Sequence, residues 1–272
     1  MTPQSRLRPQ AVLLAALLPL TTSVCAQTTA ADSELRVNGY TQVGVSRALL
    51  SDGNQNWNDQ YLRAHWQYGA TLGLNAEVSR QNHFGDRGVF VGAGFTRVFD
   101  ERWYATAAAG TSSGGFFLPR FRTDVFLHRK LLPAANLDAS VGLGYYRAKD
   151  GHQDNVLHLG AAYYFENAPV IAEGGLRFNR SNPGGVTANR AFGALTLGRH
   201  QHSQLTLRME AGREAYQLLG SDKTISDFSS KEASVNWRHW ITRDAGISLR
   251  AERYTNPSYN RRGGEFAVFA DY

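Results

Sequence analysis

The stretch WQYGATLGLNAEVSR, residues 66–80, decides the fold class. Its apolar side chains fall on every second residue, from Trp66 to Val78, and polar or small residues stand between them. A period of two predicts a β-strand with two different faces, whereas a helix repeats every 3.6 residues. The same alternation recurs over residues 35–46 and 137–146 and in most of the chain. No segment has a convincing helical period, so we expect one all-β domain.

The breaks between the predicted strands alternate between short and long. Short breaks fall at residues 100–101, 132–134, 167–168, 200–202 and 242–243, and longer polar ones at 51–59, 81–87, 112–119, 149–154, 180–187, 214–227 and 255–261. Outer-membrane β-barrels show this asymmetry, with short periplasmic turns and longer external loops. A direct count gives about 13 strands, but single-chain bacterial barrels have even numbers. A turn near Gln67-Tyr68-Gly69 would split the long stretch 61–80 and give 14 strands. If residues 33–47 lay outside the barrel, 12 would remain.

The first 26 residues have the three parts of a secretory signal peptide. Arg6 and Arg8 give a positive start, residues 11–20 are apolar, and Val24-Cys25-Ala26 precedes the expected cleavage site. We therefore expect a signal peptide over residues 1–26 and a mature domain over 27–272. Cys25 raises the alternative of a lipid-anchored N-terminus, which Val24 disfavours because lipoprotein processing requires a small residue there.

The composition of the mature chain leaves two classes of exported protein open. Cleavage would remove the only cysteine, so disulfides cannot hold the fold. Losing Arg6 and Arg8 lowers the formal charge from +6 to +4, which together with export argues against nucleic acid as a partner. No apolar run after residue 26 reaches the ~20 residues that a spanning helix needs. The chain is then either an exported water-soluble β-protein or a transmembrane β-barrel.

Charged side chains of both signs recur in mid-strand, always on the face opposite the apolar one. In a sandwich they would meet water. In a barrel they would point into the lumen, because Arg or Lys on the lipid face at mid-bilayer costs about 2–4 kcal/mol. The barrel explains why the other face lacks charges. The candidate lumen-lining residues are Arg120, Arg122, Asp124, His128, Lys130, Glu173, Arg177, Arg208, Glu210, Arg250 and Glu252.

The residues from Arg120 to Lys130 form the strongest chemical cluster, for which three interpretations stay open. The cluster could be a constriction that selects anionic or sugar-like solutes. It could be a structural charge network that stiffens the lumen. An enzyme would need a serine or an acid facing His128, which the sequence does not show.

Two local motifs resemble a catalytic or a metal site, and neither meets the requirements of one. Residues 110–114 match G-x-S-x-G, but a hydrolase elbow requires a helix after the turn, and a polar loop follows here. His200 and His202 supply only two ligands in an exposed turn, which defines no metal site. We therefore expect no enzyme activity, no cofactor and no metal.

Three motifs resemble the YaiO family of outer-membrane β-barrels. They are Arg122-x-Asp124, the Lys-Leu-Leu-Pro turn at 130–133 and the Gly-Tyr-Tyr-Arg strand end at 144–147. The order of strands and turns is similar from about Arg36 to Tyr272. The resemblance implies the outer membrane of a Gram-negative cell and a role near envelope polysaccharide export. It implies no particular functional residues.

The chain ends in GGEFAVFADY, residues 263–272, with apolar or small side chains at Phe266, Val268, Ala270 and Tyr272. This ending resembles the signal by which the barrel-assembly machinery recognises its substrates. Pairing it with residues 36–45 would close the sheet and remove its edges.

The expected function is a channel or conduit with a zwitterionic, slightly basic lumen, for small polar or saccharide solutes, or an accessory to polysaccharide export. The expected partners are outer-membrane lipid, the barrel-assembly machinery, saccharides and polysaccharide export proteins. A non-conducting structural barrel is the alternative, followed by an enzyme that modifies lipid or glycan.

Overall fold

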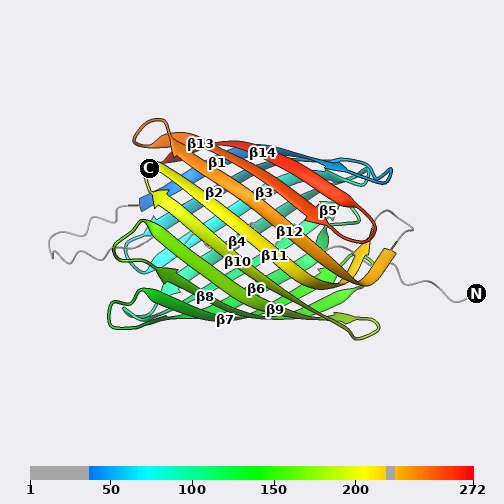
Figure 1. The fold of residues 1–272 in the computed structure, drawn as a ribbon, viewed down its shortest axis with the longest axis horizontal. Coiled ribbons are helices and arrows are strands. Elements are labelled where there is room, and N and C mark those ends of the chain that lie inside the picture. The colour runs from blue at the N-terminus through cyan, green and yellow to red at the C-terminus, as the bar shows by residue number, and fades with distance from the viewer. Residues whose placement is uncertain (1–36, 219–223) are drawn as a thin grey trace, which may run out of the picture.

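The structure, a computed structural model, describes residues 37–218 and 224–272. The expected signal peptide at residues 1–26 and the alternative lipid anchor at Cys25 lie outside the described residues. Figure 1 shows the described chain as one barrel of tilted strands, with the C-terminus at one end of the long axis.

In the described residues, fourteen antiparallel strands form a single closed sheet, in which each strand pairs with its neighbours in sequence and β1 also pairs with β14. This confirms the predicted all-β barrel of 14 strands. The 12-strand alternative placed residues 33–47 outside the barrel. The described part of this segment, from residue 37 on, belongs to the first strand and lies within the barrel. The turn expected near Gln67-Tyr68-Gly69, which gives an even number of strands, is also present, at residues 69–71. The strands are β1 Val37–Leu50, β2 Trp57–Tyr68, β3 Leu72–His83, β4 Asp86–Val98, β5 Trp103–Gly114, β6 Pro119–Leu131, β7 Leu137–Ala148, β8 Gln153–Tyr164, β9 Val170–Asn182, β10 Val186–Arg199, β11 Ser203–Leu218, β12 Thr224–Trp240, β13 Ala245–Thr255 and β14 Asn260–Asp271.

The first and last strands close the barrel, as their sequences predicted. The β1–β14 register runs from Tyr40 opposite Asp271 to Leu50 opposite Arg261. Gly39 and Tyr272 extend the ladder, since the Gly39 amide donates to the Tyr272 carbonyl at 2.8 Å and the Tyr272 amide donates back at 3.0 Å. The sheet therefore has no free edge.

The loops expected to be long are all shorter than predicted where the structure describes them, and several of them are mostly strand. Only Phe84 and Gly85 separate β3 from β4, where residues 81–87 were expected to form a loop. Residues 183–185 connect β9 to β10, and 256–259 connect β13 to β14. Polar residues continue the period-two alternation there, so their backbone groups stay in the ladder. We call this end, opposite the C-terminus, the loop end, and the other the turn end.

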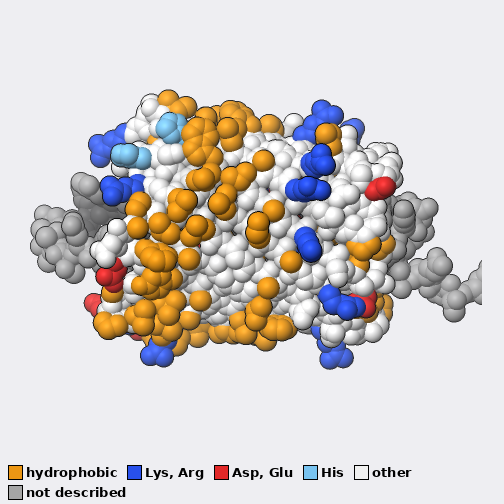
Figure 2. Space-filling model, in the orientation of Figure 1, with side chains coloured by type: hydrophobic (Ala, Val, Ile, Leu, Met, Phe, Trp, Pro, Cys, Tyr) orange, Lys and Arg blue, Asp and Glu red, His pale blue; other side chains and the backbone are white. Residues whose placement is uncertain are grey.

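The outward face carries an apolar band. Exposed large apolar side chains occur on nearly every strand, among them Val43, Val91, Leu143, Leu176, Met209 and Phe266. On the face that Figure 2 shows, hydrophobic side chains gather over the turn-end half and the middle of the barrel. Such a surface suits the hydrocarbon of a membrane, because lipid solvates apolar side chains that water does not. The described residues contain no helix long and apolar enough to cross a membrane.

Glycines on the inward face receive aromatic rings from neighbouring strands. Phe126 lies opposite Gly142, and Phe192 lies opposite Gly175. A Cβ atom added to Gly142 would meet Phe126 Cδ1 at 2.3 Å, and one added to Gly175 would meet Phe192 Cε1 at 2.6 Å. The rings therefore lie against the wall of the barrel, which keeps them out of the centre of the lumen.

Replacing Gly142 by valine should destabilise the barrel by about 1–3 kcal/mol, because the new side chain displaces the Phe126 ring. Gly193→Val is the matched control, since a Cβ there has no neighbour closer than 3.9 Å. Urea unfolding from lipid vesicles measures both. Equal stability of the two variants would contradict the wall-packed ring.

Deleting Tyr272 should lower the fraction of the protein folded in the membrane while leaving its synthesis and export unchanged. The deletion removes two backbone hydrogen bonds of the seam and the terminal aromatic side chain. Heat-modifiable migration of the membrane fraction measures assembly. Tyr272→Phe, which keeps the backbone and the ring, is the control. Normal assembly of the deletion would refute the role of this residue.

Candidate functional site

The barrel interior holds an extended set of paired charges on strands β9 to β14. Arg190 on β10 lies at one centre of it, with its Nη1 2.6 Å from Glu214 Oε1 and its Nε 2.8 Å from Glu210 Oε1. Arg177 and Arg208 also reach Glu210, at 3.7 and 3.3 Å. Because inward positions on adjacent strands stand opposite one another, the register itself brings these side chains together.

A second centre lies nearer the C-terminal strand. Arg261 on β14 reaches Glu252 at 3.0 Å and Glu232 at 3.6 Å. Arg250 reaches the same two carboxylates, at 3.1 and 3.6 Å. The Tyr254 hydroxyl donates to Glu214 at 2.9 Å, and the Arg261 guanidinium lies 4.9 Å from the centroid of the Tyr254 ring, so Tyr254 connects the two centres. We call this set the interior charge network: Arg177, Arg190, Arg208, Glu210, Glu214, Glu232, Arg250, Glu252 and Arg261.

The charged ladder expected on β6 is divided into pairs. Arg122 Nε donates to Asp124 Oδ2 at 2.7 Å, and both side chains are buried. His128 contacts Asp138 at 3.2 Å, and Tyr104 donates to the same carboxylate at 2.7 Å. Arg122 and His128 therefore each contact a carboxylate, and these two side chains do not form a cluster that could hold an anion.

Arg120 and Lys130 stand apart from these pairs. A bulge between Pro119 and Phe121 makes Arg120 the extra residue of its strand, and its side chain is exposed. The bulge interrupts the alternation from which its place in the ladder was inferred. Lys130 lies at the turn end of β6 and is half-buried.

Glu173 differs from the other candidate carboxylates. Its register places it opposite Ala162 on β8 and Ala194 on β10. Within residues 37–218 and 224–272, no cationic side chain lies within ion-pair distance of Glu173. An acid with small neighbours on both sides is open to solutes in the lumen.

Sequence reasoning missed a polar cluster at the β1–β14 seam. Tyr61 donates to Glu265 at 2.6 Å and accepts a hydrogen bond from Gln42 at 2.8 Å. Arg238 reaches Asp271, the last residue of β14, at 3.3 Å. These residues lie on β1, β2, β12 and β14, so no single strand sequence shows them as a cluster. Only closure of the barrel brings them together.

It also missed an aromatic cluster at the loop end. The ring of His83 stacks between Trp57 at 4.1 Å and Phe117 at 4.4 Å, measured between ring centroids. Phe84 packs edge-on against Trp57 and Tyr259. These rings come from four hairpins of the loop end, β1–β2, β3–β4, β5–β6 and β13–β14. They narrow the mouth of the barrel on one side, and we call them the mouth cluster.

The interior is acidic rather than slightly basic, because carboxylates outnumber cations at the inward positions of the described strands. The inward cations are Arg63, Arg122, Lys130, Arg177, Arg190, Arg208, Arg238, Arg250 and Arg261. The inward carboxylates include Asp59, Glu77, Asp124, Asp138, Asp154, Glu173, Glu210, Glu214, Glu232, Glu252, Glu265 and Asp271. The excess positive charge of the protein therefore lies on the outside.

The motifs considered for catalysis and metal binding have ordinary structural surroundings. Ser112 donates its hydroxyl to the Pro119 carbonyl at 2.5 Å across the β5–β6 loop. His200 lies 3.5 Å from Asp271 and packs edge-on against Trp240. Within the part of the chain that the structure describes, no group of three or more His, Cys, Asp or Glu residues could hold a metal ion.

Comparison with known proteins places the chain among membrane β-barrels. A family model described as the YaiO membrane beta barrel domain matches residues 38–217. No curated protein matches the chain. Among solved structures, the monoaromatic hydrocarbon channel CymD is similar with a TM-score of 0.55 and 8% identity, over 86% of this chain and 87% of that one.

Two further structures have the same architecture. The Acinetobacter baumannii outer membrane protein Omp33 is similar with a TM-score of 0.53 and 9% identity, over 86% of this chain and 98% of that one. A bacterial polysaccharide outer membrane secretin is similar with a TM-score of 0.53, 9% identity and the same coverage. At these identities the likeness establishes the fold alone.

Replacing Arg190 by methionine should destabilise the barrel by about 3 kcal/mol, because it leaves Glu210 and Glu214 buried with fewer partners. Arg213→Met is the matched control, since it breaks the exposed pair between Arg213 and Asp227 and should change stability little. Urea unfolding from vesicles measures both. An Arg190 variant as stable as the control would show that the network does not hold the fold.

Proposed function

The chain belongs to the YaiO family of membrane β-barrels, and on that premise we propose that it is an outer-membrane conduit for small polar solutes. We include saccharides among these solutes and assign the protein no enzymatic step. Residues 1–26 would act as the export signal in a Gram-negative cell. The barrel-assembly machinery would recognise the strand that ends at Tyr272.

The width of the barrel supports a conduit. Eight strands enclose only enough space for side chains, whereas 16 to 18 leave an aqueous channel. Fourteen strands lie between these limits, so the placement of the inward side chains decides whether a passage remains. Aromatic rings such as Phe126 and Phe192 lie against wall glycines, which leaves space beside them.

The exposure of the interior arginines carries the proposal. The side chains of Arg63, Arg250 and Arg208 are 25%, 22% and 18% exposed, although all three point inward. Arg190 and Arg261, in the same interior, are 2% and 0% exposed. The first three therefore border space that solvent can enter, and the last two belong to the wall.

The chemistry of this surface suits neutral polar solutes and cations. Guanidinium groups donate hydrogen bonds and carboxylates accept them, so alternating charges of both signs can replace the water around sugar hydroxyls. The excess of carboxylates repels anions. A role in envelope polysaccharide export is compatible with this lining, and the fold likeness to a polysaccharide secretin is consistent with it.

A non-conducting structural barrel is the second candidate. The mouth cluster favours it, because Trp57, Phe117 and Tyr259 are almost fully buried at the loop end. A mouth closed in this way would leave the interior charge network as a rigid filling.

Planar-bilayer conductance of the refolded protein separates the two candidates. We expect stable single-channel steps with a preference for cations, and Arg208→Gln should strengthen that preference by removing an exposed positive charge from the lumen. Arg199→Gln, at an exposed position outside the lumen, should leave the reversal potential unchanged. A folded but silent protein would refute the conduit, and a preference for anions would refute the assignment of the lumen charge.

A further inference from the structure

A row of cationic side chains encircles the outside of the barrel near the loop end. Each occupies an outward position of its strand and is exposed. Figure 2 shows several of them aligned across the barrel, beyond the apolar band. We call this row the cationic belt: Arg47, Arg80, Arg87, Arg147, Arg180, Arg213, Lys231, Arg253 and Arg262.

The belt borders the apolar band directly. On most of these strands, the next outward residue toward the middle of the barrel is apolar, for example Val45 before Arg47, Val78 before Arg80, and Phe178 before Arg180. If the apolar band lies in hydrocarbon, the guanidinium groups lie at the level of the lipid headgroups. Long cationic side chains are stable at that depth because their charged ends reach the interface.

The belt brings like charges together. Arg253 on β13 stands directly opposite Arg262 on β14. Arg47 on β1 and Lys231 on β12 lie on diagonals to this pair, since Leu49 is opposite Arg262 and Thr255 is opposite Lys231. Like charges placed directly opposite on one face destabilise a sheet.

Protein carboxylates do not offset this repulsion. Within the part of the chain that the structure describes, none of Arg47, Lys231, Arg253 and Arg262 has a carboxylate within ion-pair distance. The ion pair seen in the belt is the one between Arg213 and Asp227, at 2.6 Å. An external anion that bridges Arg253 and Arg262 would relieve the repulsion.

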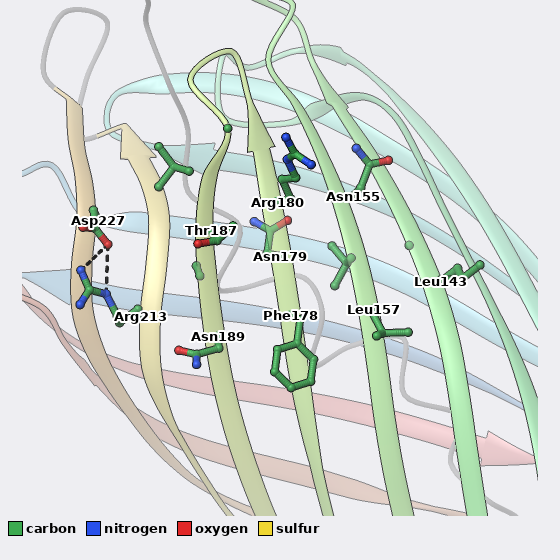
Figure 3. Close-up of a pocket in the computed structure, with 15 residues that line it drawn as sticks. Leu143, Asn155, Leu157, Phe178, Asn179, Arg180, Thr187, Asn189, Arg213 and Asp227 are labelled. Carbon is green, nitrogen blue, oxygen red and sulfur yellow. Dashed lines mark hydrogen bonds and ion pairs between the residues drawn. The ribbon is translucent and has the colours of Figure 1, made fainter.

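The surface beside the cationic belt combines apolar side chains with polar and cationic ones, as a site for a lipid requires. An open hollow of about 1000 Å³ spans the outward face from β7 to β12. Figure 3 shows the apolar side chains of Leu143, Leu157 and Phe178 in it, with Arg180 and Asn155 nearer the loops. Thr187 and Asn189 add hydroxyl and amide groups to the same lining.

We propose that the cationic belt binds the phosphate groups of a phosphorylated glycolipid in the leaflet at the loop end. Its acyl chains would lie along Leu143, Leu157 and Phe178, and its sugar hydroxyls would meet Thr187, Asn189 and Asn155. Arginine suits this ligand because its planar guanidinium group can hold two phosphate oxygens at once. This assignment is independent of whether the lumen conducts, since the belt lies on the outside.

In the described chain the turn end has fewer exposed cations at outward strand positions, namely Arg97, Arg129 and Arg199, although the loops of both ends carry exposed carboxylates, with Asp52 and Asp150 at the loop end. At the turn end, exposed carboxylates of Asp100, Glu101, Glu166 and Asp244 are interspersed with Arg102, Arg129, Arg199 and Arg243. A surface of mixed sign has no preference for polyanionic lipid. The two ends therefore match two leaflets that differ in headgroup charge.

Native mass spectrometry of the full protein in detergent tests the proposal. The probes are bis-phosphorylated lipid A, the same lipid with both phosphates removed, and phosphatidylglycerol. We expect the first to bind more tightly than the other two, with an affinity that falls as salt is added. Arg180→Gln with Arg213→Gln, the two belt cations that line the hollow, should weaken its binding about tenfold or more.

The matched control is Arg199→Gln with Arg243→Gln, which removes two exposed cations from the turn end and should leave binding unchanged. Heat-modifiable migration verifies that each variant is folded. If the first double variant does not fold, Arg253→Gln with Arg262→Gln removes instead the two cations that face each other in the belt. Binding unaffected in the folded belt variants would overturn the proposal. Equal binding of the dephosphorylated lipid or of phosphatidylglycerol would overturn the assignment to a phosphorylated glycolipid.

Discussion

The hydrogen bonding of the backbone is the constraint on which the rest of the structure depends. In hydrocarbon an unpaired amide or carbonyl group has no water to replace its partner, so a sheet that crosses a membrane must close on itself. The β1–β14 seam provides this closure, and the reciprocal hydrogen bonds between Gly39 and Tyr272 extend it to the last residue. Closure fixes which strands are neighbours, and the register then fixes which side chains meet.

Closure also creates the interior, and the interior must accommodate its charges. Arg190 and Arg261 are almost inaccessible to solvent, and a buried guanidinium group without partners would be strongly unfavourable. Each has two carboxylates within 3.6 Å. Arg63, Arg208 and Arg250 reach solvent in the same interior, so the charges serve both as a rigid wall and as the lining of the proposed conduit.

The outer surface separates charge from apolar area along the barrel axis. The apolar band meets lipid, and the cationic belt follows it at the loop end alone. Because the interior carries more carboxylates than cations, the net positive charge of the chain lies in the belt and in the turns. The molecule therefore presents different electrostatic surfaces to the two leaflets and to the lumen.

The sequence by itself determined the strands, their number and their two faces, because alternation is a local property that each strand carries alone. It located Arg122, Asp124, Arg177, Arg208, Glu210, Arg250 and Glu252 at alternate positions of their strands, and the structure places them at inward positions. It misjudged Arg120, since one bulge ends the alternation, and it mistook polar strand ends for long loops. The partners of Arg190, the mouth cluster and the pairing of Arg253 with Arg262 were decided only in the tertiary structure. Each depends on the register between strands, which closure of the barrel sets and no single strand encodes.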